Sequence, residues 1–367
     1  MGFHQRINMI NIRKSLLLIS ILFSLSPTIM ADTSFSTQHY FNKWAKENAI
    51  VGAALAINNE KYFYGFSNIS LDKPVTEKTQ FGIGSITKTF ISVILLKLEA
   101  EGKLNIHDSI TKYLPQYSKL KEVKIKDLMQ MTAGFNDVEN DATSPLQQVN
   151  MAYEQYNPKS DKSWLYSNVS YQLLGILIEK VTQQSLGEVL SAKITSPLHL
   201  NSIHFPDKLQ ASSLKEYQNN QVKKSNFNKA YATGGLVSNV SDLESFIRHL
   251  FVNKDILPEK QYKELTTFVE TSAQYYAFTG TKAPQFGLGV FKWDIPPYGY
   301  VLNYSGVLRE GFTSAYTVIG NNVIISQSNT YNNNDFTILW PHRAFTKKII
   351  ENFTKLRSES IHNISSG

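Results

Sequence analysis

A serine is followed three residues later by a lysine at several places in the sequence, among them Ser85, Ser109, Ser118 and Ser212. In a helix the two side chains of such a pair lie on the same face, and the amine can take the proton that an attacking serine must lose. The chain has no cysteine, so a covalent mechanism would need a serine, threonine, lysine or carboxylate. These pairs are therefore the first candidates for a catalytic site.

The pair at Ser85 differs from the others because it opens a long apolar helix. Gly82-Ile83-Gly84 precedes it, and the helical pattern continues to Gly102. The Ser85 hydroxyl would lie near the positive end of this helix, with Lys88 one turn further on. The other pairs lie in polar sequence that predicts turns or loops. A serine at this position also commonly caps a helix, so local sequence leaves the catalytic and capping interpretations open.

A second group of residues with useful chemistry is Tyr166-Ser167-Asn168. In an extended segment a Tyr and an Asn two residues apart project to the same side, and a phenol beside an ammonium group can relay a proton. The Tyr-x-Asn pattern recurs at Tyr40, Tyr217 and Tyr331, so alone it carries little information. The sequence has no His-Glu-x-x-His motif and no His and carboxylate residues at metal-ligand spacing. We expect neither a metal nor another cofactor.

The elements that must position these residues are strands at both ends of the chain and helices in its middle. Asn58 and Asn59 suit the bend of a hairpin between two β-rich runs within 50–67. Helices are predicted at 37–48, 85–101, 125–131, 170–182, 241–251 and 341–355. Late strands are predicted at 286–293, 300–305, 312–319 and 323–329, with turns at 296–299 and 320–322.

This order of elements predicts an α/β (α+β) fold. One antiparallel sheet flanked by helices would be built from both chain ends, with an all-α domain inserted between them. We expect a sheet lobe from about 32–104 and 246–367, and an all-α lobe over about 105–245. Loops and helix ends that face the cleft between two such lobes are a usual place for a site.

Residues 1–31 have the pattern of a secretory signal peptide, with three basic residues, no acidic residue and an apolar run at 16–25. The run is shorter than the roughly 20 apolar residues that span a membrane. We expect cleavage after Ala31, no stable membrane anchor afterwards, and export to the periplasm or the exterior of a bacterium. Cleavage would lower the net charge from +7 to +4, and the mature chain has no basic stripe, which argues against nucleic acid.

Taken in order, these motifs resemble those of the serine β-lactamase and penicillin-binding protein (DD-peptidase) superfamily, in its class C-like branch. The similarity covers about residues 37–350 and continues after Ser85 through the Tyr166 motif. The intervening and following segments that fit are 101–104, 113–115, 124–135, 196–198 and 233–238. Met131 stands where many relatives have a histidine. The family fold is the β-lactamase/transpeptidase-like one.

The resemblance implies a role for each residue of the first two motifs. Ser85 would attack an acyl carbon and form an acyl-enzyme, with Lys88 and Tyr166 removing its proton, although the sequence does not say which is the formal base. Asn168 would bond to Lys88 or to a substrate amide. The backbone N–H groups of Ser85 and Val307 would form the oxyanion hole.

The third motif departs from the family pattern. Tyr304-Ser305-Gly306 stands where relatives carry Lys-Thr-Gly or His-x-Gly. Gly306 would let substrate approach the strand, and the Ser305 hydroxyl can replace that of threonine. The Tyr304 phenol, however, lacks the cation that in relatives helps to hold the carboxylate of a β-lactam or a terminal D-Ala. Arg309 could supply a charge, although an exposed loop arginine is the simpler interpretation.

These observations indicate an exported serine hydrolase that acts on a small-molecule or peptide substrate. D-Ala-D-Ala-type peptidoglycan peptides and β-lactams lead as substrates, and the altered third motif makes efficient β-lactamase activity the less favoured of the two. The alternatives are an esterase of the same family and a non-catalytic penicillin-recognising sensor or binding module. A structural or nucleic-acid-binding protein is the remaining class.

Overall fold

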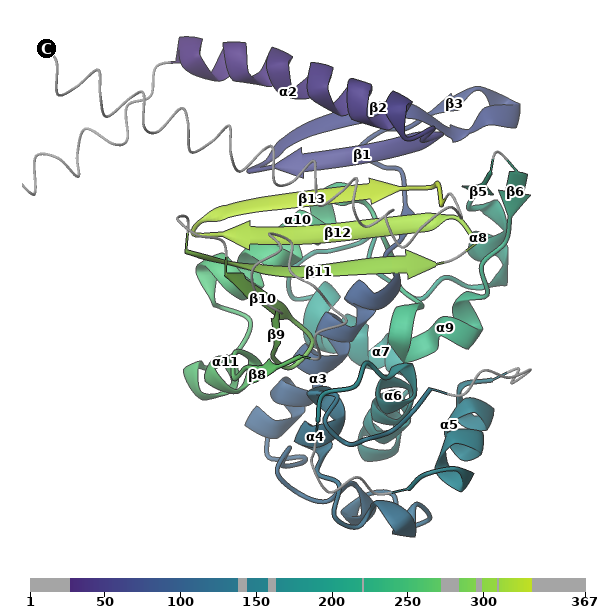
Figure 1. Ribbon diagram of the computed structural model, residues 1–367, viewed down its shortest axis with the longest axis vertical. Coiled ribbons are helices and arrows are strands. Elements are labelled where there is room, and N and C mark those ends of the chain that lie inside the picture. Colours follow the sequence, from purple (N-terminus) through teal and green to yellow (C-terminus); the bar gives the residue numbers. More distant parts are fainter. Residues whose placement is uncertain are drawn as a thin grey trace, which may run out of the picture.

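The computed structural model describes residues 27–137, 144–157, 163–219, 221–271, 284–294, 299–308 and 310–331. Within these ranges a nine-stranded antiparallel sheet has the order β3-β2-β1-β13-β12-β11-β10-β9-β8. The sheet occupies the upper half of the view in Figure 1, and a group of helices the lower half. This arrangement confirms the predicted mixed fold with one large antiparallel sheet.

The sheet is assembled from both ends of the chain, as predicted. Its strands are β1 Gly52–Ile57, β2 Glu60–Asn68, β3 Lys73–Pro74, β8 Val269–Glu270, β9 Gln285–Phe286, β10 Phe291–Asp294, β11 Tyr300–Leu308, β12 Phe312–Ile319 and β13 Asn322–Ser328. Strand β1 pairs with β2 on one side and with β13 on the other, with Leu55 opposite Ser326. Asn58 and Asn59 form the bend of the predicted hairpin with φ of 48° and 74°, a conformation that asparagine tolerates.

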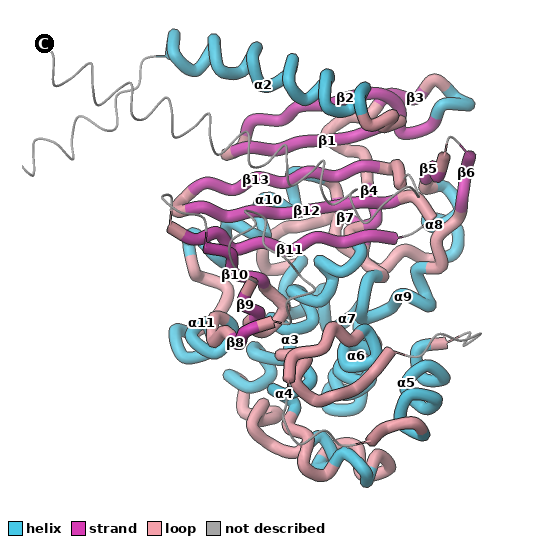
Figure 2. Tube along the Cα trace, viewed as in Figure 1, coloured by secondary structure: helices cyan, strands magenta, loops and turns pink. Residues whose placement is uncertain are grey.

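Helices cover the sheet and build the lower lobe, as Figure 2 shows by colour. The α-helices are α2 Pro27–Glu47, α3 Thr87–Ala100, α4 Ile125–Met129, α5 Pro145–Glu154, α6 Asn168–Thr182, α7 Leu186–Leu190, α8 Lys208–Ser213, α9 Phe227–Gly234, α10 Val240–Arg248 and α11 Glu259–Leu265. Single turns of 3₁₀ helix lie at Ile69–Leu71, Gly84–Ile86, Ile110–Lys112 and Ser118–Leu120, and π-helical turns at Ser191–Thr195 and His249–Asn253.

Two parts of the chain differ from the expected pattern. The predicted strand 286–293 is divided into β9 and β10, because Gly289 turns with φ of 80° and packs against α3. The Thr89 Oγ1 hydroxyl donates to the Gly289 carbonyl at 2.7 Å. The segment 105–245 is also not purely helical: it contains β5 Glu216–Gln218, β6 Gln221–Lys223 and β7 Val237–Ser238, the last paired with β4 Phe81–Gly82. Pro296, Pro297, Tyr298 and the predicted helix 341–355 lie outside the described residues.

Helix α3 is the central element of the fold. It lies between the sheet and the lower lobe, and eleven of its residues are buried. Such a helix is apolar around its whole circumference, which is typical of a core position. Phe90 stacks on Phe246 of α10 at 3.8 Å between ring centroids. Lys88 is therefore carried by an element that packing fixes from every side.

Helix α2 lies across the β1–β2 hairpin at the top of Figure 1. On its inner face, the α2 residues Phe41, Trp44 and Ala45 are buried in the core. The cleavage position expected after Ala31 falls inside this helix. In the described part of the chain, no helix combines the length and apolar character that crossing a membrane requires.

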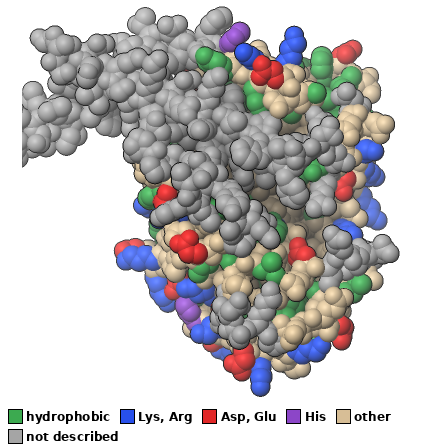
Figure 3. Space-filling model, viewed as in Figure 1, with side chains coloured by type: hydrophobic (Ala, Val, Ile, Leu, Met, Phe, Trp, Pro, Cys, Tyr) green, Lys and Arg blue, Asp and Glu red, His purple; other side chains and the backbone are tan. Residues whose placement is uncertain are grey.

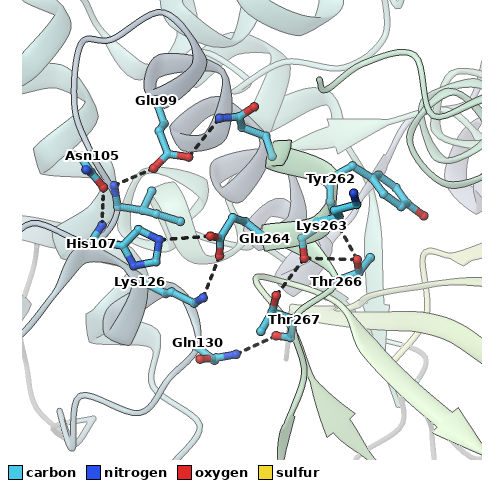
Figure 4. Close-up of polar contacts among 12 residues, drawn as sticks. Glu99, Asn105, His107, Lys126, Gln130, Tyr262, Lys263, Glu264, Thr266 and Thr267 are labelled. Carbon is cyan, nitrogen blue, oxygen red and sulfur yellow. Dashed lines mark hydrogen bonds and ion pairs between the residues drawn. The ribbon is translucent and has the colours of Figure 1, made fainter. Parts of the chain in front are cut away.

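The lower lobe is tied to α11 by a polar network, drawn in Figure 4. The Glu264 carboxylate accepts from Lys126 Nζ at 2.7 Å and lies 3.1 Å from His107 Nε2. The Glu99 carboxylate contacts both the Ile106 backbone and the Gln261 side chain. These contacts hold the segment after α3 against α11.

On the face shown in Figure 3, acidic and basic side chains are interspersed.

Candidate active site

Ser85 lies in the 3₁₀ turn that leads into α3, and it does not cap the helix. Ile86 is the N-cap residue, and its side chain makes no capping bond. The Ser85 Oγ atom instead lies 2.7 Å from the Tyr166 hydroxyl and 3.0 Å from Lys88 Nζ. The structure thus brings together the three residues that the sequence analysis named as catalytic. The capping interpretation of Ser85 does not fit this geometry.

Lys88 has the surroundings that a general base needs. Its side chain is fully buried, and Nζ donates to the Thr233 carbonyl at 2.8 Å as well as to Ser85. Burial disfavours the charged ammonium form and lowers the pKa of Lys88 from 10.5 to about 7. The negative charge of Asp137 acts in the opposite direction and raises this pKa. At neutral pH a substantial fraction of Lys88 is therefore an amine able to accept a proton.

Tyr166 closes a triangle with Ser85 and Lys88. Its hydroxyl bonds to Ser85 Oγ, and Lys88 Nζ lies 5.2 Å from the centre of its ring. Tyr171, on the first turns of α6, also presents its ring to Lys88 Nζ at 5.8 Å. The Tyr171 hydroxyl donates to the Met129 carbonyl at 2.8 Å. The lysine thus faces two tyrosine rings, and the Tyr166 hydroxyl is in contact with Ser85 Oγ.

Asn168 has a partner that the sequence did not indicate. Its Nδ2 atom donates to Asp137 Oδ2 at 2.7 Å, and Oδ1 of the same carboxylate accepts from the Val169 backbone N–H at 2.9 Å. Lys88 Nζ donates to Ser85 and to the Thr233 carbonyl, so among the described residues the side chain bonded to Asn168 is Asp137 and not Lys88. Asn168 is the first residue of α6, where the Ser167 hydroxyl accepts from the Ser170 N–H and caps the helix.

Strand β11 runs directly beside the nucleophile turn, which is the segment Gly84–Ile86 that carries the candidate nucleophile Ser85. A Cβ atom placed on Gly306 would overlap the Ile83 carbonyl oxygen and lie 2.8 Å from Ser85 N. One placed on Gly84, which has φ of 49°, would lie 2.5 Å from Val307 N. Both positions therefore require glycine for a close approach of backbones. As a result, the backbone amides of Ser85 and Val307 lie on adjoining segments.

Tyr304 points from β11 into the interior and not towards solvent. Its side chain is 1% exposed, and its ring packs against Phe291 and Phe286 at 5.2 and 6.1 Å. Burial raises the pKa of Tyr304 well above 10, and proximity to Tyr166 raises it further. The phenol is therefore neutral. Its hydroxyl and Ser305 Oγ are buried, and neither has a hydrogen-bond partner of ordinary geometry in the described part of the chain. Arg309, the possible source of a positive charge, lies outside the described residues.

Two functional features of this site were missed from the sequence. The Thr233 carbonyl accepts from Lys88, and the Asp137 carboxylate binds the start of α6. The position of a backbone carbonyl cannot be predicted from a sequence motif. The segment 233–238, in which two glycines follow Thr233, was recognised only as similar to the family. No group of three or more possible metal ligands occurs among the residues that the structure describes.

The fold and this arrangement agree with comparisons to known proteins. The profile of the beta-lactamase family matches residues 38–344. The chain therefore belongs to the beta-lactamase family.

Individual relatives are distant. A beta-lactamase of Yersinia enterocolitica is 25% identical over 297 residues, which cover 76% of this chain and 75% of that protein. Protein flp of Staphylococcus aureus (strain NCTC 8325 / PS 47) is 30% identical over 174 residues, or 42% of this chain. That match spans only 35% of the length of flp.

Solved structures share the fold at low identity. A D-amino acid amidase from Ochrobactrum anthropi SV3 superposes with a TM-score of 0.74 at 20% identity, covering 88% of this chain and 99% of the amidase. An octameric penicillin-binding protein homologue from Pyrococcus abyssi gives 0.71 at 21% identity, covering 81% and 73% of the two chains.

Proposed function

We propose that this protein is a serine hydrolase that forms an acyl-enzyme on Ser85. The observation that carries the proposal is the short contact of Ser85 Oγ with both Tyr166 and a fully buried Lys88, whose pKa is about 7. A nucleophile, a base matched to neutral pH and a proton relay within hydrogen-bond distance are the parts that covalent catalysis requires.

In the proposed acylation, Ser85 Oγ attacks the acyl carbon while its proton passes to neutral Lys88. The substrate oxygen becomes an oxyanion bound by the N–H groups of Ser85 and Val307. When the tetrahedral intermediate collapses, the bond to the leaving group breaks and Tyr166 delivers the proton that this group needs, while the Lys88 ammonium gives its proton to Tyr166 and becomes neutral again. Water then attacks the ester carbonyl and loses a proton to Lys88, the bond to Ser85 Oγ breaks, Ser85 takes that proton back as the hydroxyl, and the acid is released.

The neutral third motif supports a proposal for the substrate class. Tyr304 offers no positive charge, so a carboxylate next to the scissile bond loses the charge-assisted contact that a lysine would give. We propose acyl groups of D-amino-acid peptides and amides as substrates, with β-lactams and peptides ending in a free D-Ala carboxylate turned over less efficiently. A D-amino acid amidase and a D-stereospecific amidohydrolase are among the solved structures with this fold, as is a penicillin-binding protein homologue. The signal-peptide pattern of 1–31 supports a site of action outside the cytoplasm.

The proposal is tested by intact-mass measurement after mixing the protein with a chromogenic cephalosporin, a p-nitrophenyl ester or a D-phenylalanine amide. We expect a transient adduct that disappears as product forms, fastest for the ester and the amide. Ser85→Ala should form no adduct. Ser109→Ala is the matched control, because Ser109 belongs to the identical Ser-Ile-Thr-Lys sequence but accepts from the Thr111 N–H as a helix cap.

Each other outcome decides between the alternatives. A permanent cephalosporin adduct with no turnover of any substrate would identify a penicillin-recognising sensor. Turnover of the p-nitrophenyl ester alone would identify an esterase. An adduct that persists in Ser85→Ala, or no adduct with any compound, would exclude Ser85 as the nucleophile.

A further inference from the structure

Asp137 is an exposed acidic residue that connects two parts of the active site. It follows the buried residues 131–135, and its two carboxylate oxygens accept from the first two residues of α6. One bond fixes the Asn168 side chain at 2.7 Å, and the other satisfies the Val169 N–H at 2.9 Å. Because Tyr166 lies just before α6, this carboxylate anchors the segment that carries the phenol.

The same carboxylate acts electrostatically on Lys88. The groups that face Lys88 are Ser85 from the nucleophile turn, the Thr233 carbonyl from α9, and the phenols of Tyr166 and Tyr171 from the α6 region. Neither Ser85 nor the Thr233 carbonyl carries a charge, and burial raises the pKa of Tyr171 above its ordinary value. Among the described residues, Asp137 is the acidic group whose charge acts on Lys88. A buried ammonium is costly unless a negative charge compensates it.

We propose that Asp137 is a positioning residue of this hydrolase: it holds Asn168 and the start of α6 in place, and its negative charge stabilises the Lys88 ammonium that forms when Ser85 gives up its proton. This role rests on the proposed acyl-enzyme function. During acylation the proton moves from Ser85 Oγ to Lys88 Nζ, so the positive charge appears on Lys88 in the tetrahedral intermediate. A charge that favours this form lowers the barrier to attack.

The charge of Asp137 and its hydrogen bonds to α6 should have different effects on the kinetics when each is removed. Loss of the charge alone should favour the neutral amine of Lys88 and lower its pKa further, so the acidic limb of the pH–rate profile should shift to lower pH. It should also slow acylation, because the ammonium in the intermediate is less stable. Loss of the hydrogen bonds should reduce kcat by misplacing the segment that carries Tyr166, without a matching change in KM.

Three substitutions separate these effects. Asp137→Asn removes the charge and keeps one carbonyl acceptor; we expect the limb of kcat/KM to move down by on the order of half a pH unit and acylation to slow by about tenfold. Asp137→Glu keeps the charge but displaces the carboxylate, so the limb should stay near its original pH while kcat falls. Asp137→Ala should combine both effects. Asp127→Asn is the matched control, since Asp127 accepts from the Lys124 N–H at 3.0 Å in the capping box of α4.

A readout independent of turnover completes the experiment. With lysine labelled by ¹³C at Cε, the Lys88 resonance, assigned with Lys88→Met, should titrate at lower pH in Asp137→Asn than in the unsubstituted protein or Asp127→Asn. An unchanged Lys88 midpoint together with an unchanged pH–rate limb would overturn the proposal. If the protein forms no acyl-enzyme on Ser85, the proposed function fails, whereas the titration still shows whether Asp137 acts on Lys88.

Discussion

At the scale of single residues, burial is the main cause of the lowered pKa of Lys88. The helix that carries it packs on all sides, and the side chain reaches the Thr233 carbonyl and Ser85 without access to water. Burial destabilises the ammonium form, so a residue that is ordinarily charged up to about pH 10 becomes a base near neutrality.

The pH dependence of activity should report this group. Because Lys88 must be neutral to accept the Ser85 proton, kcat/KM should be low below pH 7 and rise through a midpoint of about 7. Lys88→Arg keeps a permanent positive charge and should reduce kcat/KM at every pH by roughly 10³-fold or more. Lys112→Arg, in the second Ser-Ile-Thr-Lys sequence, should leave the profile unchanged. A rate that stays constant from pH 5 to 9 would contradict the role of Lys88.

Tyr304 should determine how the protein treats substrates with a carboxylate. Tyr304→Lys and Tyr304→His introduce the residue types of relatives, and we expect the ratio of kcat/KM for a carboxylate-bearing substrate to that for an uncharged ester to rise by about tenfold. Tyr304→Phe keeps an uncharged ring of the same shape at this buried position. It should leave the ratio unchanged. An unchanged ratio in both cationic variants, with folding verified by circular dichroism, would exclude this role.

At the scale of elements, the nucleophile turn and β11 form one unit. The turn can approach the strand only because Gly84 and Gly306 have no side chains. This approach places the backbone amides of Ser85 and Val307 on adjoining segments.

A methyl group on Gly306 should separate the two segments. Gly306→Ala would push Cβ against the Ile83 carbonyl, and we expect kcat/KM to fall by roughly 10²-fold or more as Val307 N–H moves. Gly187→Ala is a suitable control, because its nearest neighbour is a Phe205 carbon at 3.9 Å. Steady-state kinetics with the p-nitrophenyl ester would measure both. Full activity in Gly306→Ala would show that the approach is not required.

Sequence patterns predicted the structure correctly where it depends on residues close together in the sequence. Helical spacing placed Ser85 and Lys88 on one face, and the two asparagines predicted the β1–β2 bend. The break between β9 and β10 was missed because it depends on the packing of Gly289 against Ser92 of α3, a contact between distant segments. Asp137 was missed for the same reason, since its partners are defined only once α6 is folded beside it.

At the scale of the whole molecule, the network around Glu264 joins the lower lobe to α11 (Figure 4). Burial alone would raise the pKa of Glu264, but the hydrogen bonds from Lys126 and His107 outweigh it and lower the pKa below 4.5. Since the folded protein favours the ionised form, the network stabilises the protein above about pH 4.5. This contribution is lost as the pH falls through the folded-state pKa.

Glu264→Gln should therefore lower the free energy of unfolding at pH 7, because Lys126 and His107 lose a charged acceptor. The difference from the unsubstituted protein should shrink as the pH approaches 3.5. Urea denaturation at both pH values would measure it. Glu259→Gln, on the same helix but with a side chain 82% exposed, should have little effect at either pH. An equal difference at pH 7 and 3.5 would show that the charge of Glu264 is not the cause.

The pairing of β1 with β13 also sets the order in which the chain can fold. The centre of the sheet joins Ala53 to Ser328, and the Val51 N–H bonds to the Thr330 hydroxyl at 2.8 Å. Contacts between residues so far apart in sequence form slowly, because a long loop must close before they can contribute. During synthesis, the nucleophile turn therefore has no strand beside it until β11 leaves the ribosome. Catalytic competence should appear all at once at the end of translation, and a nascent chain that ends before β11 should remain open to proteases.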